Sequence, residues 1–388
     1  MRFPSKKLLV TLTAIILMIL ACSLPGVVAP TLTAVIVAPT AITATPTASL
    51  PAVVSPQIVY FHMLDANNGW AISDTSVLRT SDGGATWYNV TPSAVSSLGF
   101  STASFYLDAN TAWVALPGAD PTSGGTLYRT IDGGATWAPV PVPFGGGSIE
   151  FLDTSNGWDL VELSGAMSHE AVAVFTTGDG GNTWSRVFID DPTVTGSSDT
   201  LPLVGDKNGI TALDASHAWV TGAQPSSNFV YIYVSQDGGH TWTHQNVAIP
   251  SGYAGAMTSA FPPTFFGSSA GVLPVLLMAN NSGVVFYNSH DAGQTWTASQ
   301  PVAQGGRYIS VASMADFFVW VGGTTLNVSH DSGSTWSVVS PNIDVRDTLA
   351  SFQFVDANTG WALTVDASNH HSLYKTTDGG ATWTALIP

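Results

Sequence analysis

Thr80-Ser81-Asp82-Gly83-Gly84-Ala85-Thr86-Trp87 is the stretch that decides the fold, because its pattern occurs seven times along the chain. The pattern, called the box below, is Ser/Thr-x-Asp-x-Gly-x-Thr-Trp. Its aspartates are Asp82, Asp132, Asp179, Asp237, Asp291, Asp331 and Asp378. Trp87 and Trp383 are 296 residues and six intervals apart, so one unit has about 49 residues. A period of this length indicates a fold built from packed repeats.

A second motif precedes each box. In the first unit it reads Leu64-Asp65-Ala66-Asn67-Asn68-Gly69-Trp70. Related segments end at Trp113, Trp158, Trp219, Trp320 and Trp361, and Val272 stands at this position in the fifth unit. The two motifs together account for all 13 tryptophans of the chain. We therefore interpret the tryptophans as core and corner residues rather than as ligand-stacking groups.

One unit is predicted to contain four short strands, here called A to D. In the first unit, apolar or β-branched runs cover residues 58–64, 70–73, 77–80 and 86–90, with turn residues between them. Seven such antiparallel sheets packed around an axis bury both of their faces. The sequence therefore predicts an all-β fold, a single seven-bladed propeller over residues 57–388.

Each box aspartate is predicted to be structural. Its carboxylate can accept backbone N–H groups inside the turn, and the box glycines allow positive φ. A calcium loop needs several carboxylates, whereas each box has one. His290 and His330 occupy the same box position in two units, so they cannot share a metal ion. We expect neither a metal site nor a cofactor.

The order of the strands predicts where a specific site can lie. In an antiparallel unit the A–B turn and the box, which is the C–D turn, share one face. The B–C loops and the links between units lie on the opposite face. These loops and links differ from unit to unit, so we expect a functional site on that variable face or in the axial channel.

The N-terminus is predicted to be a lipoprotein signal peptide covering residues 1–22. Lys6 and Lys7 precede a 13-residue apolar run, which is too short to span a membrane as a helix. Ile19-Leu20-Ala21-Cys22 fits a bacterial lipobox, and Cys22 is the only cysteine. We expect a lipid at Cys22; the alternative is an ordinary cleaved signal. Residues 23–56, rich in Thr, Pro and Ala, are predicted to be a disordered tether on an extracytoplasmic, membrane-anchored bacterial protein.

The charge of the chain limits its partners. Without Arg2, Lys6 and Lys7, seven basic residues remain against 26 acidic ones, so the mature net charge is −19. This charge disfavours nucleic acids and anionic lipid head groups. A protein or glycan ligand and a monomeric state remain as expectations.

The boxes resemble the Asp-box, or BNR repeat, of sialidases, sortilin-type receptors, xyloglucan-cleaving glycosidases and photosystem II stability/assembly factors. Asn68-Gly69-Trp70-Ala71, Thr359-Gly360-Trp361-Ala362 and the last box most resemble the assembly-factor family. The resemblance covers about residues 57–388 and implies a propeller that acts as a noncatalytic binding or assembly scaffold. That family is said to hold a membrane subunit on an arginine-rich face, whereas this chain is acidic and poor in arginine.

The alternative function is that of a sialidase-type exo-glycosidase. The resemblance to sialidases would imply an arginine triad, a Tyr/Glu pair, an acidic acid/base residue and a Phe-Arg-Ile-Pro segment, and that segment does not occur here. The best available set, which also gives the candidate binding residues, is Arg307, Tyr308, Arg346, Glu162 and Glu170. Arg79, Arg129 and Lys375 precede boxes and are interpreted as repeat features. We predict that the protein is not an enzyme.

Overall fold

The computed structural model describes residues 50–98, 102–118, 124–166, 169–278, 282–306 and 308–387. All of these residues belong to one compact unit. The expected signal peptide, the lipidation site Cys22 and most of the expected tether lie outside the described residues, so they stay predictions. Among the described residues no helix is long and apolar enough to cross a membrane.

Short antiparallel strands make up the compact unit. The first three repeat units contain β1 (Ala52–Val53), β2 (Ile58–Met63), β3 (Gly69–Ser73), β4 (Val77–Thr80), β5 (Trp87–Asn89), β6 (Ala103–Tyr106), β7 (Ala112–Pro117), β8 (Gly125–Thr130), β9 (Ala138–Val142), β10 (Ser148–Phe151), β11 (Gly157–Ala166), β12 (His169–Thr177) and β13 (Ser185–Ile189). The fourth and fifth contain β14 (Asp206–Ala212), β15 (Ala218–Ala223), β16 (Tyr231–Ser235), β17 (Thr243–His244), the 3₁₀ helix η1 (Ser251–Tyr253), β18 (Met257–Ala260), β19 (Thr264–Phe266), β20 (Ala270–Met278), β21 (Gly283–Ser289), β22 (Thr297–Ala298) and β23 (Val302–Ala303). The last two contain β24 (Tyr308–Val311), β25 (Phe317–Gly322), β26 (Thr325–Ser329), β27 (Ser337–Val339), β28 (Leu349–Phe354), β29 (Gly360–Val365), β30 (His371–Thr376) and β31 (Thr384–Ile387).

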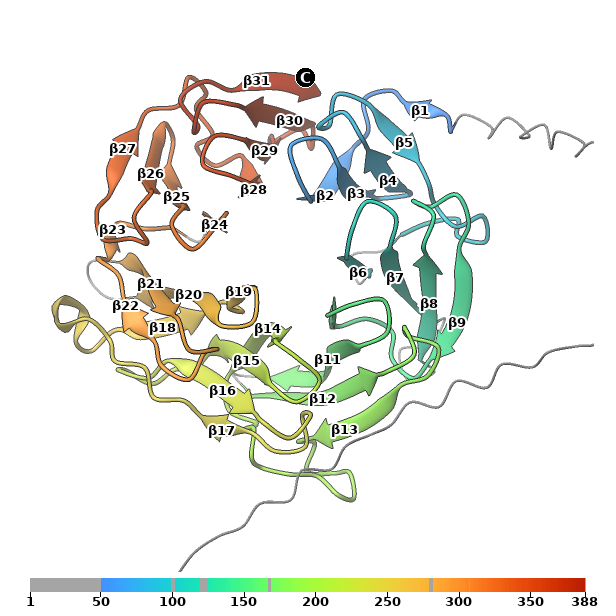
Figure 1. The fold of residues 1–388 in the computed structure, drawn as a ribbon, viewed down its shortest axis with the longest axis vertical. Helices are drawn as coiled ribbons and strands as arrows, with labels where there is room; N and C mark the ends of the chain where they lie inside the picture. The colour runs from blue at the N-terminus through green and yellow to red at the C-terminus, as the bar shows by residue number, and fades with distance from the viewer. Residues whose placement is uncertain are drawn as a thin grey trace, which may run out of the picture. The chain divides into compact units, whose positions relative to one another are not determined.

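The sheets stand around an axis, with β2, β6, β24 and β28 among the innermost strands (Figure 1). The predicted all-β propeller of antiparallel, four-stranded sheets is thus confirmed. The fourth and fifth repeat units share one ten-stranded sheet, joined by the pair Ala223↔Ser259. The seven repeat units therefore form six hydrogen-bonded sheets within the described ranges. Strand β1 adds a fifth strand to the first sheet, so the sheet includes residues that the sequence assigned to the tether.

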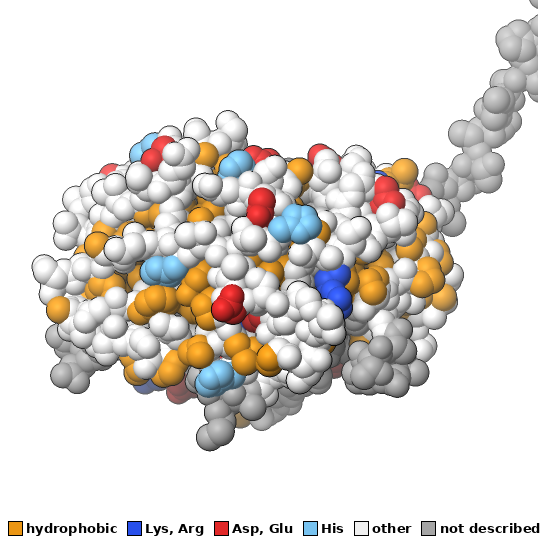
Figure 2. Space-filling model, turned by 90° about the horizontal axis from the view of Figure 1, so that it is seen from below, with side chains coloured by type: hydrophobic (Ala, Val, Ile, Leu, Met, Phe, Trp, Pro, Cys, Tyr) orange, Lys and Arg blue, Asp and Glu red, His pale blue; other side chains and the backbone are white. Residues whose placement is uncertain are grey.

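Seven hydrophobic clusters hold the described residues together, and each combines side chains from two neighbouring repeat units. Between the second and third units, for example, the rings of Trp113 and Phe151 stack with centroids 3.7 Å apart. Every sheet thus buries both faces, as the repeat period predicts. The surface has few charges: Figure 2 shows scattered acidic, basic and histidine side chains among hydrophobic and uncharged groups.

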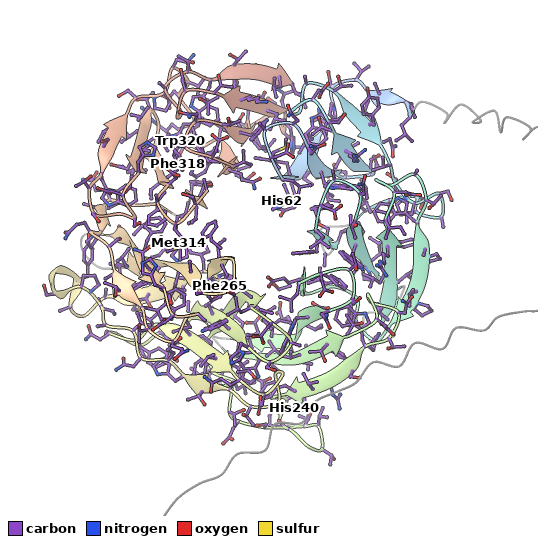
Figure 3. The ribbon with its side chains drawn as sticks, viewed as in Figure 1. His62, His240, Phe265, Met314, Phe318 and Trp320 are labelled. Carbon is purple, nitrogen blue, oxygen red and sulfur yellow. The ribbon has the colours of Figure 1, made fainter. Side chains whose placement is uncertain are left out.

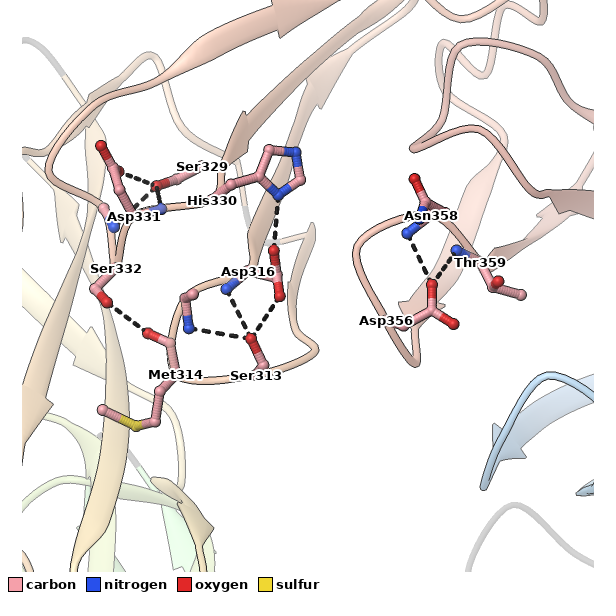
Figure 4. A network of polar contacts seen from close by, with 12 residues as sticks. Ser313, Met314, Asp316, Ser329, His330, Asp331, Ser332, Asp356, Asn358 and Thr359 are labelled. Atoms are coloured by element: carbon pink, nitrogen blue, oxygen red, sulfur yellow. Dashed lines mark hydrogen bonds and ion pairs between the residues drawn. The ribbon is translucent and has the colours of Figure 1, made fainter.

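The same hydrogen bonds hold the box in every unit. In the second unit the Thr130 hydroxyl donates to Asp132 Oδ1 (2.8 Å) and accepts the buried Gly134 N–H (2.9 Å). Asp132 also accepts the N–H and the hydroxyl of Thr136 (2.9 and 2.6 Å). Figure 4 shows part of the sixth box, and the serine or threonine and the aspartate bond in the same way in the remaining units. The carboxylate therefore organises its own turn.

The box is also bonded to the A–B turn of its own unit. The Gly83 N–H donates to Asn67 O (2.7 Å), and the Gly180 N–H donates to Ser155 O (2.7 Å). The corresponding bond occurs in the other five units. The prediction that both turns share one face is confirmed.

The sixth unit departs from the predicted second motif. Its A–B turn is closed by a hydrogen bond from the Ala312 N–H to Asp316 O, which corresponds to the bond from Leu64 to Asn68 in the first unit. The position two residues after this carbonyl carries the motif tryptophan in the first unit and Phe318 in the sixth.

The assignment of Trp320 to the motif is therefore wrong, because Trp320 lies two residues too far along β25. Phe318 takes the place of Trp70 and stacks on Phe354 with centroids 3.7 Å apart. Trp320 donates its Nε1–H to Gly323 O (3.2 Å) instead. Figure 3 labels both aromatic residues.

The ring closes without a shared sheet, because β28–β31 of the last unit all come from the C-terminal end. The Met63 N–H donates to Gln353 Oε1 (2.7 Å), and Gln353 Nε2 donates to Met63 O (2.9 Å). Trp361 Nε1 donates to Gly83 O of the first box (2.8 Å). A hydrophobic cluster of the first and last units completes this junction.

Candidate functional site

Arg79, Arg129 and Lys375 are repeat features, as predicted. Each lies directly opposite the motif tryptophan of its own unit, at 5.9, 5.4 and 4.8 Å from the ring centroid. Two of them reach the A–B turn of the next unit: Lys375 Nζ donates to Ala66 O (2.9 Å) and Arg129 donates to Thr154 O (2.9 Å). These cations join neighbouring units.

Glu162 and Glu170 lie close together on the β11–β12 hairpin of the third unit, on the variable face. A Cβ atom at Gly165 would lie 3.2 Å from Glu162 Oε1 and 4.0 Å from Glu170 Cγ. Burial raises the pKa of Glu170, and the Glu162 charge adds to this rise. The structure therefore brings these two candidates together.

Lys207, at the start of β14, lies behind this hairpin with a fully buried side chain. Its Nζ donates to the carbonyls of Glu170 (2.6 Å), Gly205 (3.2 Å) and Leu203 (3.3 Å) and lies 3.8 Å from Asp190 Oδ2. Its backbone N–H donates to Glu170 Oε2. Burial lowers the pKa of Lys207, and the Asp190 and Glu170 carboxylates oppose that change.

This Lys207 cluster ties the link after β13 to the fourth unit, and Glu170 is part of it. The sequence did not single out Lys207 or Asp190, because neither position belongs to a repeated motif.

The remaining candidates lie in the sixth and seventh units. Tyr308 begins β24 and packs against the cluster between these units. Arg346 has an exposed side chain, with Nη2 3.5 Å from Asp344 Oδ2. Arg307 lies outside the described residues. Strand β24 and the β11–β12 hairpin stand on different sides of the ring (Figure 1), so Tyr308 and Arg346 do not meet Glu162 and Glu170.

Glu150 is an acidic residue that sequence reasoning did not select as a candidate. It lies on β10, and its Oε2 accepts the Ala212 N–H of the fourth unit (3.1 Å). Burial raises the pKa of Glu150 to about 8. A carboxyl group that stays protonated near neutral pH is typical of catalytic sites. In this protein the position has a structural role, because Gln353 and Ser310 stand at the equivalent positions of the seventh and sixth units. Each of them also accepts a backbone N–H of the next unit.

Asp159 on β11 is the second unexpected acid. Its side chain is fully buried, and its carboxyl oxygens have no hydrogen-bond partner among the described residues. Burial raises the pKa of Asp159 well above its usual range. Asp159 pairs with Ile149, the neighbour of Glu150, and directly paired residues share a face of the sheet. The two acids therefore point to opposite faces and do not form a catalytic pair.

The variable face also has a hollow of about 240 Å³ in the seventh unit, whose lining includes Asp344, Asp366 and His370. The Asp366 carboxylate accepts the backbone N–H groups of Ser368 and His370 (2.8 and 2.9 Å), so it holds the B–C turn. Within the described ranges no group of three or more His, Cys, Asp or Glu side chains is arranged to hold a metal ion.

Comparison with known proteins places the chain by its fold. No family model and no curated protein matches the sequence. A structure described as YCF48 bound to a D1 peptide matches with a TM-score of 0.51 and 16% identity, over 86% of this chain and 99% of that chain. The GH74 xyloglucanase of Xanthomonas campestris matches with a TM-score of 0.56 and 12% identity, over 87% of this chain and 55% of the enzyme.

An oligogalacturonate lyase from Vibrio parahaemolyticus matches with a TM-score of 0.55 and 10% identity, over 86% of this chain and 92% of the lyase. At such identities the likeness shows the fold alone. The predicted resemblance to the photosystem II assembly factors and the wider sialidase-like propellers is confirmed at that level. One of the three structures contains a bound peptide and two are carbohydrate-acting enzymes, so the fold does not decide the activity.

Proposed function

We propose that the protein is a noncatalytic scaffold that binds a polypeptide partner and is held at the outer side of a bacterial membrane by a lipid on Cys22. The main support is the use made of the acidic side chains. Glu150 joins two units, Glu170 and Asp190 surround Lys207, and the box aspartates organise turns. Side chains engaged in this way serve the fold.

Hydrolysis of a glycoside needs two carboxyl groups, or a tyrosine and a glutamate, placed on either side of the scissile bond. The glycosidase alternative is favoured by one observation, the closeness of Glu162 and Glu170. Against it, Glu170 is bonded to the Lys207 backbone, and the candidates Tyr308 and Arg346 lie in other units. A polypeptide partner is supported by the peptide-bound structure of similar fold, which this chain covers almost completely.

The test has a hydrolysis arm and a binding arm, both with the purified full chain. We expect no release of product from a fluorogenic sialoside or from xyloglucan. We expect the immobilised protein to retain a polypeptide from the extracytoplasmic fraction of its own cell and to lose it to excess free protein.

The glutamate variants decide between the two functions. Turnover that disappears in Glu162→Gln and in Glu170→Gln, but persists in Glu150→Gln, would establish the glycosidase and refute the scaffold. Glu150→Gln is the matched control because it changes the same chemical group at a joint between units.

A further inference from the structure

The strand-C position opposite the motif aromatic differs between the repeat units. In chain order it is occupied by Arg79, Arg129, Thr176, Val234, Asn288, Val328 and Lys375. In the first, second and seventh units it is therefore a cation. Its charged end crosses to the next unit, as the bonds of Lys375 to Ala66 O and of Arg129 to Thr154 O show.

The unit that receives a cation has a glycine where the charged end arrives. The fourth residue of its box is a glycine at positive φ: Gly83, Gly133 or Gly180. A Cβ atom at these positions would meet the charged end of Lys375, Arg79 or Arg129 respectively. A cation site at these junctions thus consists of an indole ring, a turn carbonyl and an open glycine. The Asp82 carboxylate of the receiving box adds a negative charge that favours the Lys375 ammonium.

The junction between the third and fourth units has this site without the cation. Thr176 stands opposite Trp158 and is too short to cross to the next unit. A hollow of about 220 Å³ lies there, and its lining includes Trp158, Thr176 and Ala215. Ala215 has the place in its turn that Ala66 has in the first unit. In the described part of the chain the Ala215 oxygen accepts no hydrogen bond. A Cβ atom at Gly238 would have this oxygen as its nearest contact, at 3.5 Å, so the glycine is open as well.

One other junction satisfies this carbonyl without a cation. Between the fifth and sixth units, where Asn288 replaces the cation, the fourth box residue is Ser332. Its hydroxyl donates to Met314 O (2.8 Å), the carbonyl that corresponds to Ala66 O (Figure 4). Asn288 Nδ2 donates to Ser332 O (3.0 Å). The third–fourth junction has neither the cation nor the serine.

We propose that this hollow binds the guanidinium or ammonium group of an arginine or lysine side chain from a partner polypeptide. The side chain enters the hollow beside Thr176 and donates to Ala215 O, as Arg129 donates to Thr154 O within the protein. The proposal rests on the proposed function, since it names the chemistry that the scaffold recognises. The net charge of −16 draws a basic segment towards the protein.

The test fills the hollow from within in two independent ways. Thr176→Arg supplies the missing cation, in imitation of Arg129, and Gly238→Ser supplies a hydroxyl for Ala215 O, in imitation of Ser332. Thr176→Ala is the control that leaves the hollow open. Ile131→Arg is the control for charge, because Ile131 is 67% exposed on the box of another unit and adds the same charge on the same face.

The probe is a fluorescent, end-blocked nonapeptide with three Gly-Ser-Arg repeats, and its match has citrulline in place of arginine. Fluorescence anisotropy with the full-length protein gives the affinities. We expect Thr176→Arg and Gly238→Ser to weaken arginine-peptide binding by about fivefold or more, as the loss of a charged hydrogen bond implies. Thr176→Ala and Ile131→Arg should stay within about twofold of the wild type, and the citrulline peptide should bind poorly to all forms.

Three outcomes overturn the proposal: no binding of the arginine peptide to the wild type, equal binding of the citrulline peptide, or equal losses in Thr176→Arg and Ile131→Arg. If Thr176→Arg does not fold, Gly238→Ser decides alone. If a captured polypeptide partner binds every variant equally, the hollow is not its binding site, and the proposed scaffold function is unaffected. Turnover that depends on Glu162 and Glu170 refutes the scaffold independently of the hollow.

Discussion

Replacing Glu150 by glutamine should stabilise the protein at neutral pH. In the folded protein burial raises the pKa of Glu150 from 4.5 to about 8. Between these values the folded state holds a proton that the unfolded chain has released. Its stability therefore falls as the pH rises, by up to about 1.4 kcal/mol per pH unit. Gln353, at the equivalent position of the seventh unit, shows that a glutamine fits there. Its side chain accepts the Met63 N–H and donates to Met63 O of the next unit.

Between pH 4.5 and pH 7 the wild type should lose about 3 kcal/mol of folding stability through the raised pKa of Glu150. Water partly screens the half-buried side chain, which reduces the expected loss to about 2 kcal/mol. Urea unfolding followed by tryptophan fluorescence at pH 4.5, 7 and 8 measures it. We expect Glu150→Gln to equal the wild type at pH 4.5 and to exceed it increasingly towards pH 8. A difference that stays constant with pH, or a variant less stable than the wild type at pH 8, would refute the reasoning.

Four further changes test other parts of the structure. Thr130→Val leaves the buried Gly134 N–H unpaired and should lower the free energy of unfolding by about 1–3 kcal/mol, whereas an unchanged urea midpoint would mean that the box hydroxyl is dispensable. Gln353→Leu removes both bonds to Met63 and should cost about 1–3 kcal/mol in the same assay, with faster proteolysis at the junction of the first and last units; a proteolysis rate equal to that of the wild type argues against this closure. Lys207→Met leaves the Asp190 carboxylate buried without a cation and should cost about 3–5 kcal/mol, and adding Asp190→Asn should restore part of it; a single variant as stable as the wild type contradicts the cluster. Cys22→Ser should abolish labelling by radioactive palmitate and release the protein from the membrane fraction, and retained membrane binding would show another anchor.

The repeat made most of the fold predictable from the sequence. Seven boxes and the second motif determine the strand order, the four-stranded units and the face on which the turns meet, because the same residues solve the same local problem each time. The errors lie where units deviate. Phe318 could not be recognised as the motif aromatic, since Trp320 offered the expected residue two positions later. The sheets of the fourth and fifth units are joined by the pair Ala223↔Ser259, which no local sequence pattern predicts.

The candidate site was less predictable, because proximity between loops has no sequence signal. The closeness of Glu162 and Glu170 follows from the register of the β11–β12 hairpin, and the separation of Tyr308 and Arg346 from them follows from the ring. Lys207 was missed because a lysine in a link reads as a surface residue until three carbonyls are seen around its ammonium group.

Several departures from the repeat lie in the third unit. Asp159 places a buried, unpartnered acid where Ala71 stands in the first unit. Thr176 stands where Arg129 joins the second and third units, and the β11–β12 hairpin is the longest in the described ranges. An unpartnered buried acid lowers stability, and the other units fold without one at this position. Residues that lower the stability of one repeat unit without contributing to its folding indicate a functional role. We therefore expect the third unit, with its hollow beside the fourth, to be the part of the ring that meets the partner.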